Sequence, residues 1–352
     1  MTEQVKTIAV VGASPFAWLL AGLLASDHSR AIVLLSPPPN PYALRALPSL
    51  SLAPVTRPQT WSMLLGHARP AVRRLSRIVP TIGERIDVRM FARSPEASTA
   101  LSHMRHIADG FGYPADPVEK TPLGTSVGLR DVRMIDAGAL HAAAPSWLTA
   151  ANVAVLNSMD GLKIRRDGSA RFGTTAIDQV ILADDDAIVQ WLDPDEIGTF
   201  ARLETWTGVE TAPQRHARYR AGFDLDTGAV FAQASDGVVR AAARNDDGKA
   251  LTRIADCLTL DPAPRLAAQS GFTRLCSHDG APVLGPTRRG KLFVVAGLGV
   301  LDLVLAPLVA GIISERASGV EVEWAAAHGA DLRQPRREVA EFHPGRLAGG
   351  AP

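Results

Sequence analysis

The pattern of apolar and polar positions changes along the chain, and its first 35 residues already predict a fold. Residues 7–12 (TIAVVG) form a short β-branched run ending in glycine, which indicates a strand buried on both faces. Residues 15–26 predict a helix beginning at Pro15, and Ala31 to Leu35 a second strand. Strand, tight turn, helix and strand within about 30 residues predict a βαβ unit and a parallel sheet.

A second group of elements is predicted in the middle of the chain. Short alternating runs separated by Asp-Gly and Thr-Gly turns favour a largely antiparallel sheet within residues 196–270. Residues 67–93 predict a helix followed by a strand. The other expected elements are helices over 97–113 and around 137–148, strands at 153–157, 161–165 and 178–183, and alternating runs at 218–224, 228–233 and 237–244.

The most apolar stretch, residues 292–313, is long enough to span a membrane. Asp302 lies near its centre, where a charge costs about 2.5–3.5 kcal/mol on insertion. Gly297, Gly299 and Pro307 interrupt it as well. We therefore expect a buried strand, a glycine turn and a buried helix, with no membrane span.

Composition restricts the function classes. The 352 residues include 37 Lys+Arg and 36 Asp+Glu, so the net charge of +1 gives no general attraction for nucleic acid or anionic membranes. A 46% hydrophobic content suits a folded protein with one or two packed domains. Two cysteines are too few for a disulfide framework or a four-cysteine zinc site. With no secretory signal in the first residues, a cytoplasmic location is expected.

Two polar patterns have ordinary explanations. His103 and His106 have the i, i+3 spacing of metal ligands, but no third ligand lies at a useful offset, and no metal site is predicted. Residues 67–93 carry seven arginines against Glu84 and Asp87. This segment is either a docking face for an acidic partner or a solvated helix and strand, and the second interpretation is favoured.

Four separated motifs resemble those of one enzyme family. Arg274 precedes Asp279-Gly280-Ala281-Pro282 by five residues, and residues 292–313 read as a strand, a Gly-x-Gly turn and a helix. Residues 341–348 (EFHPGRLA) and Arg133 to Asp136, before a helix, are the other two. In this order they resemble the FAD-dependent oxidoreductases of the D-amino-acid oxidase and glycine oxidase type.

The resemblance implies a fold and a domain organisation. We expect an α/β fold, α+β overall, in which a Rossmann-like FAD-binding domain carries an inserted, mainly antiparallel substrate domain. The FAD-type domain is expected to be discontinuous, over residues 1–65, 130–195 and 270–348, and the substrate or cap domain to cover 66–129 and 196–269.

The resemblance also implies a cofactor and a site. FAD would lie against the first turn and the last Gly-x-Gly, and a small amino-acid or amine substrate would bind beside Arg274, whose guanidinium would fork onto a carboxylate. The cofactor-binding residues expected on this basis are Gly12, Ala13, Ser14, Pro15, Phe16, Ser36, Met159, Ala183, Gly297, Leu298, Gly299, Val300 and Leu301.

The chain departs from the family pattern at four places where FAD would be held. The first turn reads Gly12-Ala13-Ser14-Pro15-Phe16-Ala17, which keeps only the first of three glycines. Ser36 replaces the acid expected at the ribose. Asp184-Asp185-Asp186 follow a strand that should end in Ala-x-Gly, and Asp302 lies at the positive end of the last helix. FAD binding is therefore expected to be weak or lost.

Other polar residues near these motifs have two interpretations each. Cys276 is either a covalent flavin attachment point or a small buried residue, and the second is favoured. His278 is either an acid/base group or a turn histidine bonded to the backbone, and again the second is favoured. Tyr219 either lines the substrate cavity or covers the second sheet, and the second interpretation is favoured. A structural role for Arg274, in an ion pair, stays open.

Two hypotheses about function follow, with a nicotinamide-using enzyme as a weaker third. In the first, the chain is an FAD-dependent oxidoreductase that moves hydride from a C–N bond to flavin, with Arg274 as the substrate anchor. In the second, it is a degenerate, non-catalytic family member that serves as a structural subunit or partner of an active flavoprotein, or forms a homo-oligomer. The first is put forward narrowly, because Arg274 and the last Gly-x-Gly are retained.

Overall fold

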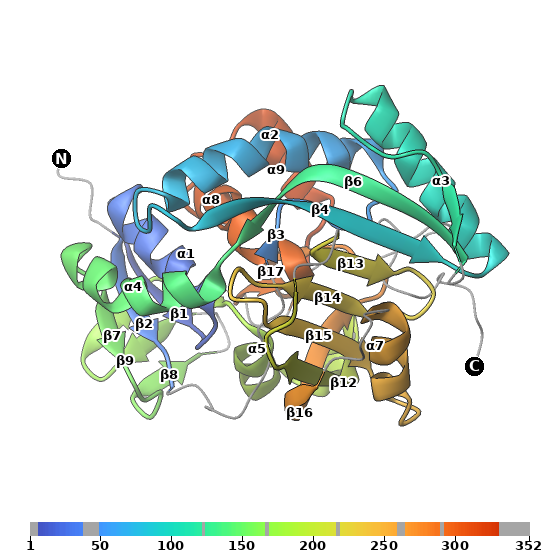
Figure 1. Ribbon diagram of the computed structural model, residues 1–352. Helices are drawn as coiled ribbons and strands as arrows, with labels where there is room; N and C mark the ends of the chain where they lie inside the picture. Colours follow the sequence, from blue (N-terminus) through green and yellow to red (C-terminus); the bar gives the residue numbers. More distant parts are fainter. Residues whose placement is uncertain are drawn as a thin grey trace.

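The computed structural model describes residues 6–37, 49–121, 124–165, 169–215, 219–258, 265–288 and 292–330. Within these residues a six-stranded sheet and a nine-stranded sheet lie next to each other, and helices pack against both (Figure 1). The candidate site lies where the two sheets meet.

The six-stranded sheet contains the predicted βαβ unit. Its strand order is β17-β18-β11-β1-β2-β7, and all neighbours are parallel except β17, which is antiparallel to β18. Helix α1 (Pro15–Ser26) connects β1 to β2, which confirms the predicted unit. The strands are β1 (Thr7–Val11), β2 (Ala31–Leu35), β7 (Ala154–Leu156), β11 (Gln179–Leu182), β17 (Val283–Pro286) and β18 (Phe293–Ala296).

Strand β1 is buried on both faces, as its β-branched run predicted. Ile8 and Val10 belong to the large core shared with the helices. Ala9 and Val11 face a second core, which a small sheet of β8 (Leu162–Ile164), β9 (Ala170–Phe172) and β10 (Thr175–Ile177) helps to cover. Both sets of side chains are at most 1% exposed, so the strand is apolar at every position after Thr7.

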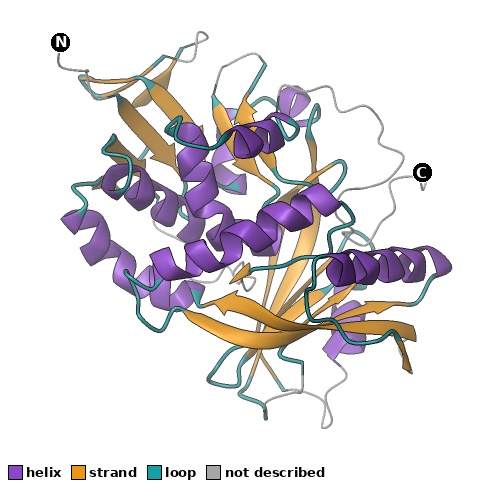
Figure 2. Ribbon diagram, turned by 90° about the horizontal axis from the view of Figure 1, so that it is seen from above, coloured by secondary structure: helices purple, strands orange, loops and turns teal. Residues whose placement is uncertain are grey.

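The nine-stranded sheet is mainly antiparallel, as predicted for the second sheet. Its order is β16-β12-β15-β14-β13-β4-β6-β3, β5 pairs with β6, and the β13–β4 pair is parallel. Seen from above, helices lie along its long strands (Figure 2). The strands are β3 (Ser49–Leu50), β4 (Gly83–Ala92), β5 (Glu119–Thr121), β6 (Gly124–Ile135), β12 (Ala201–Thr211), β13 (Ala221–Asp224), β14 (Val230–Gln233), β15 (Val239–Arg244) and β16 (Leu266–Ser277).

Helix α8 (Asp302–Ile313) explains the most apolar stretch of the sequence. It packs against α1 and α2 (Pro58–Leu75) and is buried on nearly all sides, so it needs apolar residues around its whole circumference. The preceding residues form β18 and a glycine turn, which confirms the expected strand, turn and helix. Among the described residues, no helix has the length and apolar character needed to cross a membrane.

Several helices begin where the local sequence supplies a capping side chain. The side chains of Ser14, Ser94, Asp136, Asp184 and Ser318 each accept a hydrogen bond from a backbone N–H in the first turn. The other helices are α3 (Pro95–Gly110), α4 (Ala137–Ala150), α5 (Asp185–Trp191), α6 (Pro194–Ile197), α7 (Ala250–Leu258) and α9 (Gly319–Ala326).

The expected α/β fold class is confirmed, and some details differ from the sequence pattern. Two long strands of the second sheet, β12 and β16, and helix α7 were not predicted within residues 196–277. The expected motif at 341–348 lies outside the described residues. The division into two discontinuous domains stays a prediction.

Candidate functional site

Two cavities lie where the sheets meet, and Arg274 lines both. The inner cavity, of about 110 Å³, lies between β12, β14, β15 and β16 and the turn before α8. The turn cavity, of about 340 Å³, lies beside the β1–α1 turn and the carboxyl end of β11. They share Arg274, Leu275 and the turn from Gly297 to Gly299.

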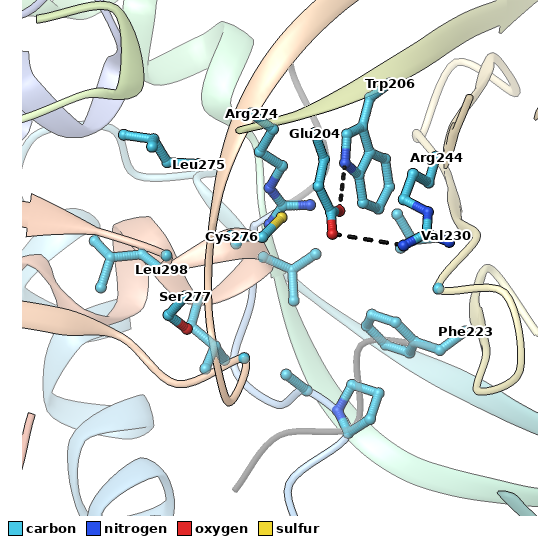
Figure 3. Close-up of a pocket in the computed structure, with 18 of the residues that line it drawn as sticks. Glu204, Trp206, Phe223, Val230, Arg244, Arg274, Leu275, Cys276, Ser277 and Leu298 are labelled. Carbon is cyan, nitrogen blue, oxygen red and sulfur yellow. Dashed lines mark hydrogen bonds and ion pairs between the residues drawn. The ribbon is translucent and has the colours of Figure 1, made fainter. Parts of the chain in front are cut away.

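Arg274 extends from β16 into the wall between the cavities (Figure 3). Its guanidinium carbon lies 5.0 Å from the ring centroid of Trp206, a cation–π contact. A Cβ atom at Gly299 would lie 2.8 Å from Arg274 Nη2, so the glycine makes room for the guanidinium. No described residue forms a hydrogen bond or an ion pair with this side chain. Arg274 is thus held over an aromatic ring with its donors available.

Glu204 is the buried carboxylate of the inner cavity, at 7% exposure. Its oxygens accept hydrogen bonds from Arg202 Nε at 2.7 Å and Trp206 Nε1 at 3.3 Å, and Arg244 Nη1 lies 3.6 Å away (Figure 3). Burial raises the pKa of Glu204, but the Arg202 hydrogen bond and the nearby arginines outweigh it and leave the pKa below its ordinary value. The network therefore holds an ionised carboxylate opposite Arg274.

The turn cavity contains a carboxylate at the start of α1. Asp184 Oδ2 accepts hydrogen bonds from the backbone N–H groups of Ala13, at 2.6 Å, and Ser14, at 3.1 Å. These amides belong to the turn that would face a dinucleotide pyrophosphate. Strands β1 and β11 are parallel neighbours, with Val11 opposite Leu182, which brings Asp184 to the turn. The carboxylate lies in the anion-binding position of the fold.

The carboxyl end of β2 is also occupied by the chain's own side chains. Ser36 is 3% exposed, and its hydroxyl accepts a hydrogen bond of 2.8 Å from Trp18 Nε1. The Trp18 ring stacks on His141, with centroids 4.7 Å apart. Ser36, expected at the ribose, is therefore already bonded to an indole on α1.

Two further carboxylates line the turn cavity. Asp185 accepts a hydrogen bond from the Leu275 N–H, and Asp302 hydrogen-bonds with Ser49. Burial raises the pKa of each to about 6, although these hydrogen bonds and the charge of Arg274 act in the opposite direction. With Asp184, whose pKa burial also raises, the cavity carries an acidic lining.

The raised pKa of Asp302 predicts a pH dependence of stability. The folded protein holds this proton more tightly than the unfolded chain, so the free energy of unfolding should fall as the pH rises from about 4 to about 6. Asp302→Asn should reduce this fall. The free energy of unfolding of the variant minus that of wild type should therefore be larger above pH 6 than at low pH. Urea denaturation across that range measures both slopes, and equal slopes would contradict the assignment.

The expected cofactor residues are only partly brought together. Ala13, Ser14, Pro15, Phe16 and Ala183 line the turn cavity, Val300 and Leu301 line the inner cavity, and Gly297, Leu298 and Gly299 line both. Gly12, Ser36 and Met159 line neither of the two cavities. Met159 packs instead against the second core. The two expected halves of the site thus adjoin, while Ser36, expected at the ribose, lines neither cavity.

Sequence reasoning missed most of the inner cavity. Glu204 and Trp206 project from one face of β12, and Arg244 comes from β15, which pairs with it. The i, i+2 spacing of Glu204 and Trp206 was the available signal, since alternate residues of a strand share a face. Cys276 lines the cavity and is half-buried; burial raises its pKa to about 12, so its thiol is protonated.

The remaining single residues have structural roles. His278 Nε2 contacts the Gly198 carbonyl at 3.2 Å, and the Tyr219 hydroxyl donates to Asp116 at 3.0 Å in the second sheet, both as favoured. His103 Nε2 contacts the Thr56 carbonyl at 3.1 Å. In the described part of the chain, no three side chains of His, Cys, Asp or Glu gather in a metal-binding arrangement.

The residues present do not fit FAD held in the way the family resemblance implies. The Asp184 carboxylate takes up the two turn amides that a pyrophosphate would need. If the Asp184 carboxylate and a pyrophosphate were both present at the turn, each pair of like charges 4 Å apart would repel by about 1 kcal/mol in water and about 4 kcal/mol near a protein surface. Asp302 opposes negative charge at the other end of the cavity. The turn cavity is therefore not a site for flavin chemistry in this conformation.

Comparison with solved structures supports the fold. The chain is similar to fructosamine oxidase from Aspergillus fumigatus, with 13% identity, 99% of this chain and 95% of that one covered, and a TM-score of 0.73. Glycine oxidase from Geobacillus kaustophilus is 16% identical, with 89% of this chain and 96% of that one covered and a TM-score of 0.68. L-proline dehydrogenase from P. horikoshii is 13% identical, with 92% of this chain and 97% of that one covered and a TM-score of 0.69. No protein-family model and no curated protein sequence matches the chain.

These structures define the class of fold. The chain has the fold of these amino-acid and amine oxidases and dehydrogenases over nearly its whole length, which is the fold that the motifs predicted. At 13–16% identity the likeness concerns the fold, and the site must be judged on its own residues.

Proposed function

We propose that the chain is a flavin-free protein of the oxidase fold that binds a small carboxylate ligand of the amino-acid class in its inner cavity. The observation that carries this proposal is the Arg274 guanidinium, which stacks on Trp206, faces the cavity and has no hydrogen bond or ion pair with any described residue. A half-buried guanidinium without an acceptor gains most from a bidentate carboxylate.

The charges around the inner cavity favour an anion. Three arginines, Arg202, Arg244 and Arg274, line it together with two carboxylates, Glu204 and Asp224. Asp224 pairs with Arg93 at 3.2 Å, and Glu204 is held by its own arginines. Similar structures named for glycine, L-proline and iminodiacetate point to ligands that carry a carboxylate beside an amine.

Flavin-dependent hydride transfer, the hypothesis put forward from the sequence, is the second candidate function. The retained Gly297 and Gly299 favour it, since the family places this turn against the flavin. It requires Asp184 to leave the turn amides, and the two hydrogen bonds that Asp184 accepts there oppose this. A partner subunit or homo-oligomer and a cytoplasmic location stay predictions.

Ligand titration tests the proposal. Glycine, L-proline and iminodiacetate are titrated by calorimetry alongside their methyl esters, which lack the charged carboxylate. Arg274→Ala should weaken binding about ten- to hundredfold, the value of a charge-assisted hydrogen bond, and Arg274→Lys should weaken it less. Arg240→Ala is the matched control, because Arg240 pairs with Glu210 on the same sheet outside both cavities.

The outcomes separate the alternatives. Binding of an acid but not its ester, lost with Arg274→Ala and kept with Arg240→Ala, supports the proposal. Equal binding of acid and ester, or equal affinity in wild type and Arg274→Ala, contradicts it. Absence of binding for all three acids also contradicts the proposal, since the cavity would then select another class of ligand.

A further inference from the structure

We propose that the carboxylate of Asp184 replaces the pyrophosphate of a dinucleotide at the β1–α1 turn, so that the chain fills its own cofactor site. Asp184 lines the turn cavity and not the inner cavity, so its role does not depend on which ligand Arg274 binds.

The two oxygens of Asp184 have separate partners. Oδ2 accepts from Ala13 N and Ser14 N, while Oδ1 accepts from Ala187 N at 2.9 Å and caps α5. One side chain thus joins the first turn of the chain to a helix about 170 residues later. A bound anion could supply the contacts to the turn, but the contact to α5 belongs to this aspartate.

Gly12 has a role in this contact. A Cβ atom at residue 12 would lie 2.7 Å from Asp184 Oδ2, which is closer than real Cβ atoms approach an oxygen. The glycine that the family uses for the tight turn here also leaves room for the side chain of Asp184. The one retained glycine of the turn is therefore explained without a cofactor.

The remaining groups of the turn, and Ser36 at the expected ribose position, also have hydrogen-bond partners within the chain. Ser14 Oγ accepts from Ala17 N at 3.2 Å, and Pro15 has no N–H to offer. Ser36 is bonded to Trp18. The departures seen in the sequence are thus mutually consistent, since each replaces a contact that a dinucleotide would make with one from the protein.

The test removes the Asp184 contact and keeps the α5 cap. In Asp184→Ser the shorter hydroxyl still caps Ala187 N but does not reach the turn. Asp136→Ser is the matched control, because Asp136 caps α4 in the same way through Ala139 N. Inorganic pyrophosphate and ADP are titrated into wild type and both variants, by calorimetry and by thermal unfolding.

Asp184→Ser should bind pyrophosphate at least about tenfold more tightly than wild type, and its melting temperature, lowered by the substitution, should rise again with added pyrophosphate. Asp136→Ser should behave as wild type towards pyrophosphate. Equal affinity in wild type and Asp184→Ser overturns the proposal, as does equal gain in both variants. Binding of pyrophosphate alone supports a vacated anion site, and added affinity for ADP supports retained space for a nucleoside.

A measurement on the unchanged protein covers the case in which Asp184→Ser does not fold. The Ala13 and Ser14 amides should exchange slowly with deuterium in the wild type without any added ligand, and pyrophosphate should not slow them further. Rapid exchange of these two amides that pyrophosphate suppresses would overturn the proposal.

Discussion

Freshly purified chain should be colourless, with no absorption band at about 450 nm, and incubation with excess FAD should add none that survives gel filtration. The reason is the Asp184 carboxylate, which holds the amides of Ala13 and Ser14 that would bind the pyrophosphate. Asp185 and Asp302 add further negative charge along the same cavity. The visible spectrum before and after incubation is the measurement.

A flavoprotein of the same fold, stripped of FAD and reloaded in parallel, controls for the procedure. Flavin bound to the wild type at near one per chain would falsify the flavin-free assignment and restore the oxidoreductase hypothesis, with Arg274 as its anchor. Flavin bound to Asp184→Ser but not to wild type would leave that assignment intact and identify Asp184 as the principal barrier.

Replacing Glu204 with leucine should destabilise the fold by about 1–3 kcal/mol, because the substitution leaves the mostly buried Arg244 and the buried Trp206 indole N–H without their shared acceptor, whereas the exposed Arg202 can turn to solvent. Glu204→Gln should cost less, since its amide oxygen still accepts one hydrogen bond. Urea denaturation gives both free energies of unfolding.

Glu210 on the same strand provides the comparison for Glu204. It pairs with Arg240 at 2.9 Å in a more exposed position, so Glu210→Leu should cost no more than about 1 kcal/mol. If Glu204→Leu and Glu210→Leu were equally mild, the inner cavity would not depend on its ionised network, and the carboxylate-binding proposal would lose its fixed geometry.

Strands β1 and β2 of the first sheet were predictable because nearly all of their residues are apolar. Ile8 to Val11 and Ala31 to Leu35 are short continuous apolar runs, and recognising them needs no knowledge of distant segments. The long strand β16 was harder, because residues 266–269 at its start are exposed and show no alternation. Its end, around Arg274, was found only through the family resemblance.

The candidate site shows a different limit of sequence reasoning. The acids after β11 were recognisable as unfavourable for a pyrophosphate, because like charges repel whatever the details. That Asp184 would take the place of the pyrophosphate was not, since its partners are backbone amides of Ala13 and Ser14, which have no signature in the sequence. The inner cavity required the pairing of β12 with β15 and β16, which is set by long-range contacts.

The position of β11 in the first sheet also orders events during synthesis. Strand β1 lies between β2 and β11, so once residues 7–35 have left the ribosome it still has one unpaired edge. That edge stays open until Gln179 to Leu182 emerge, and Asp184 closes the adjoining turn immediately afterwards. Chain elongation therefore sets the time at which the second edge of β1 is paired, and the anion at its turn arrives with the polypeptide itself rather than by diffusion of a small molecule.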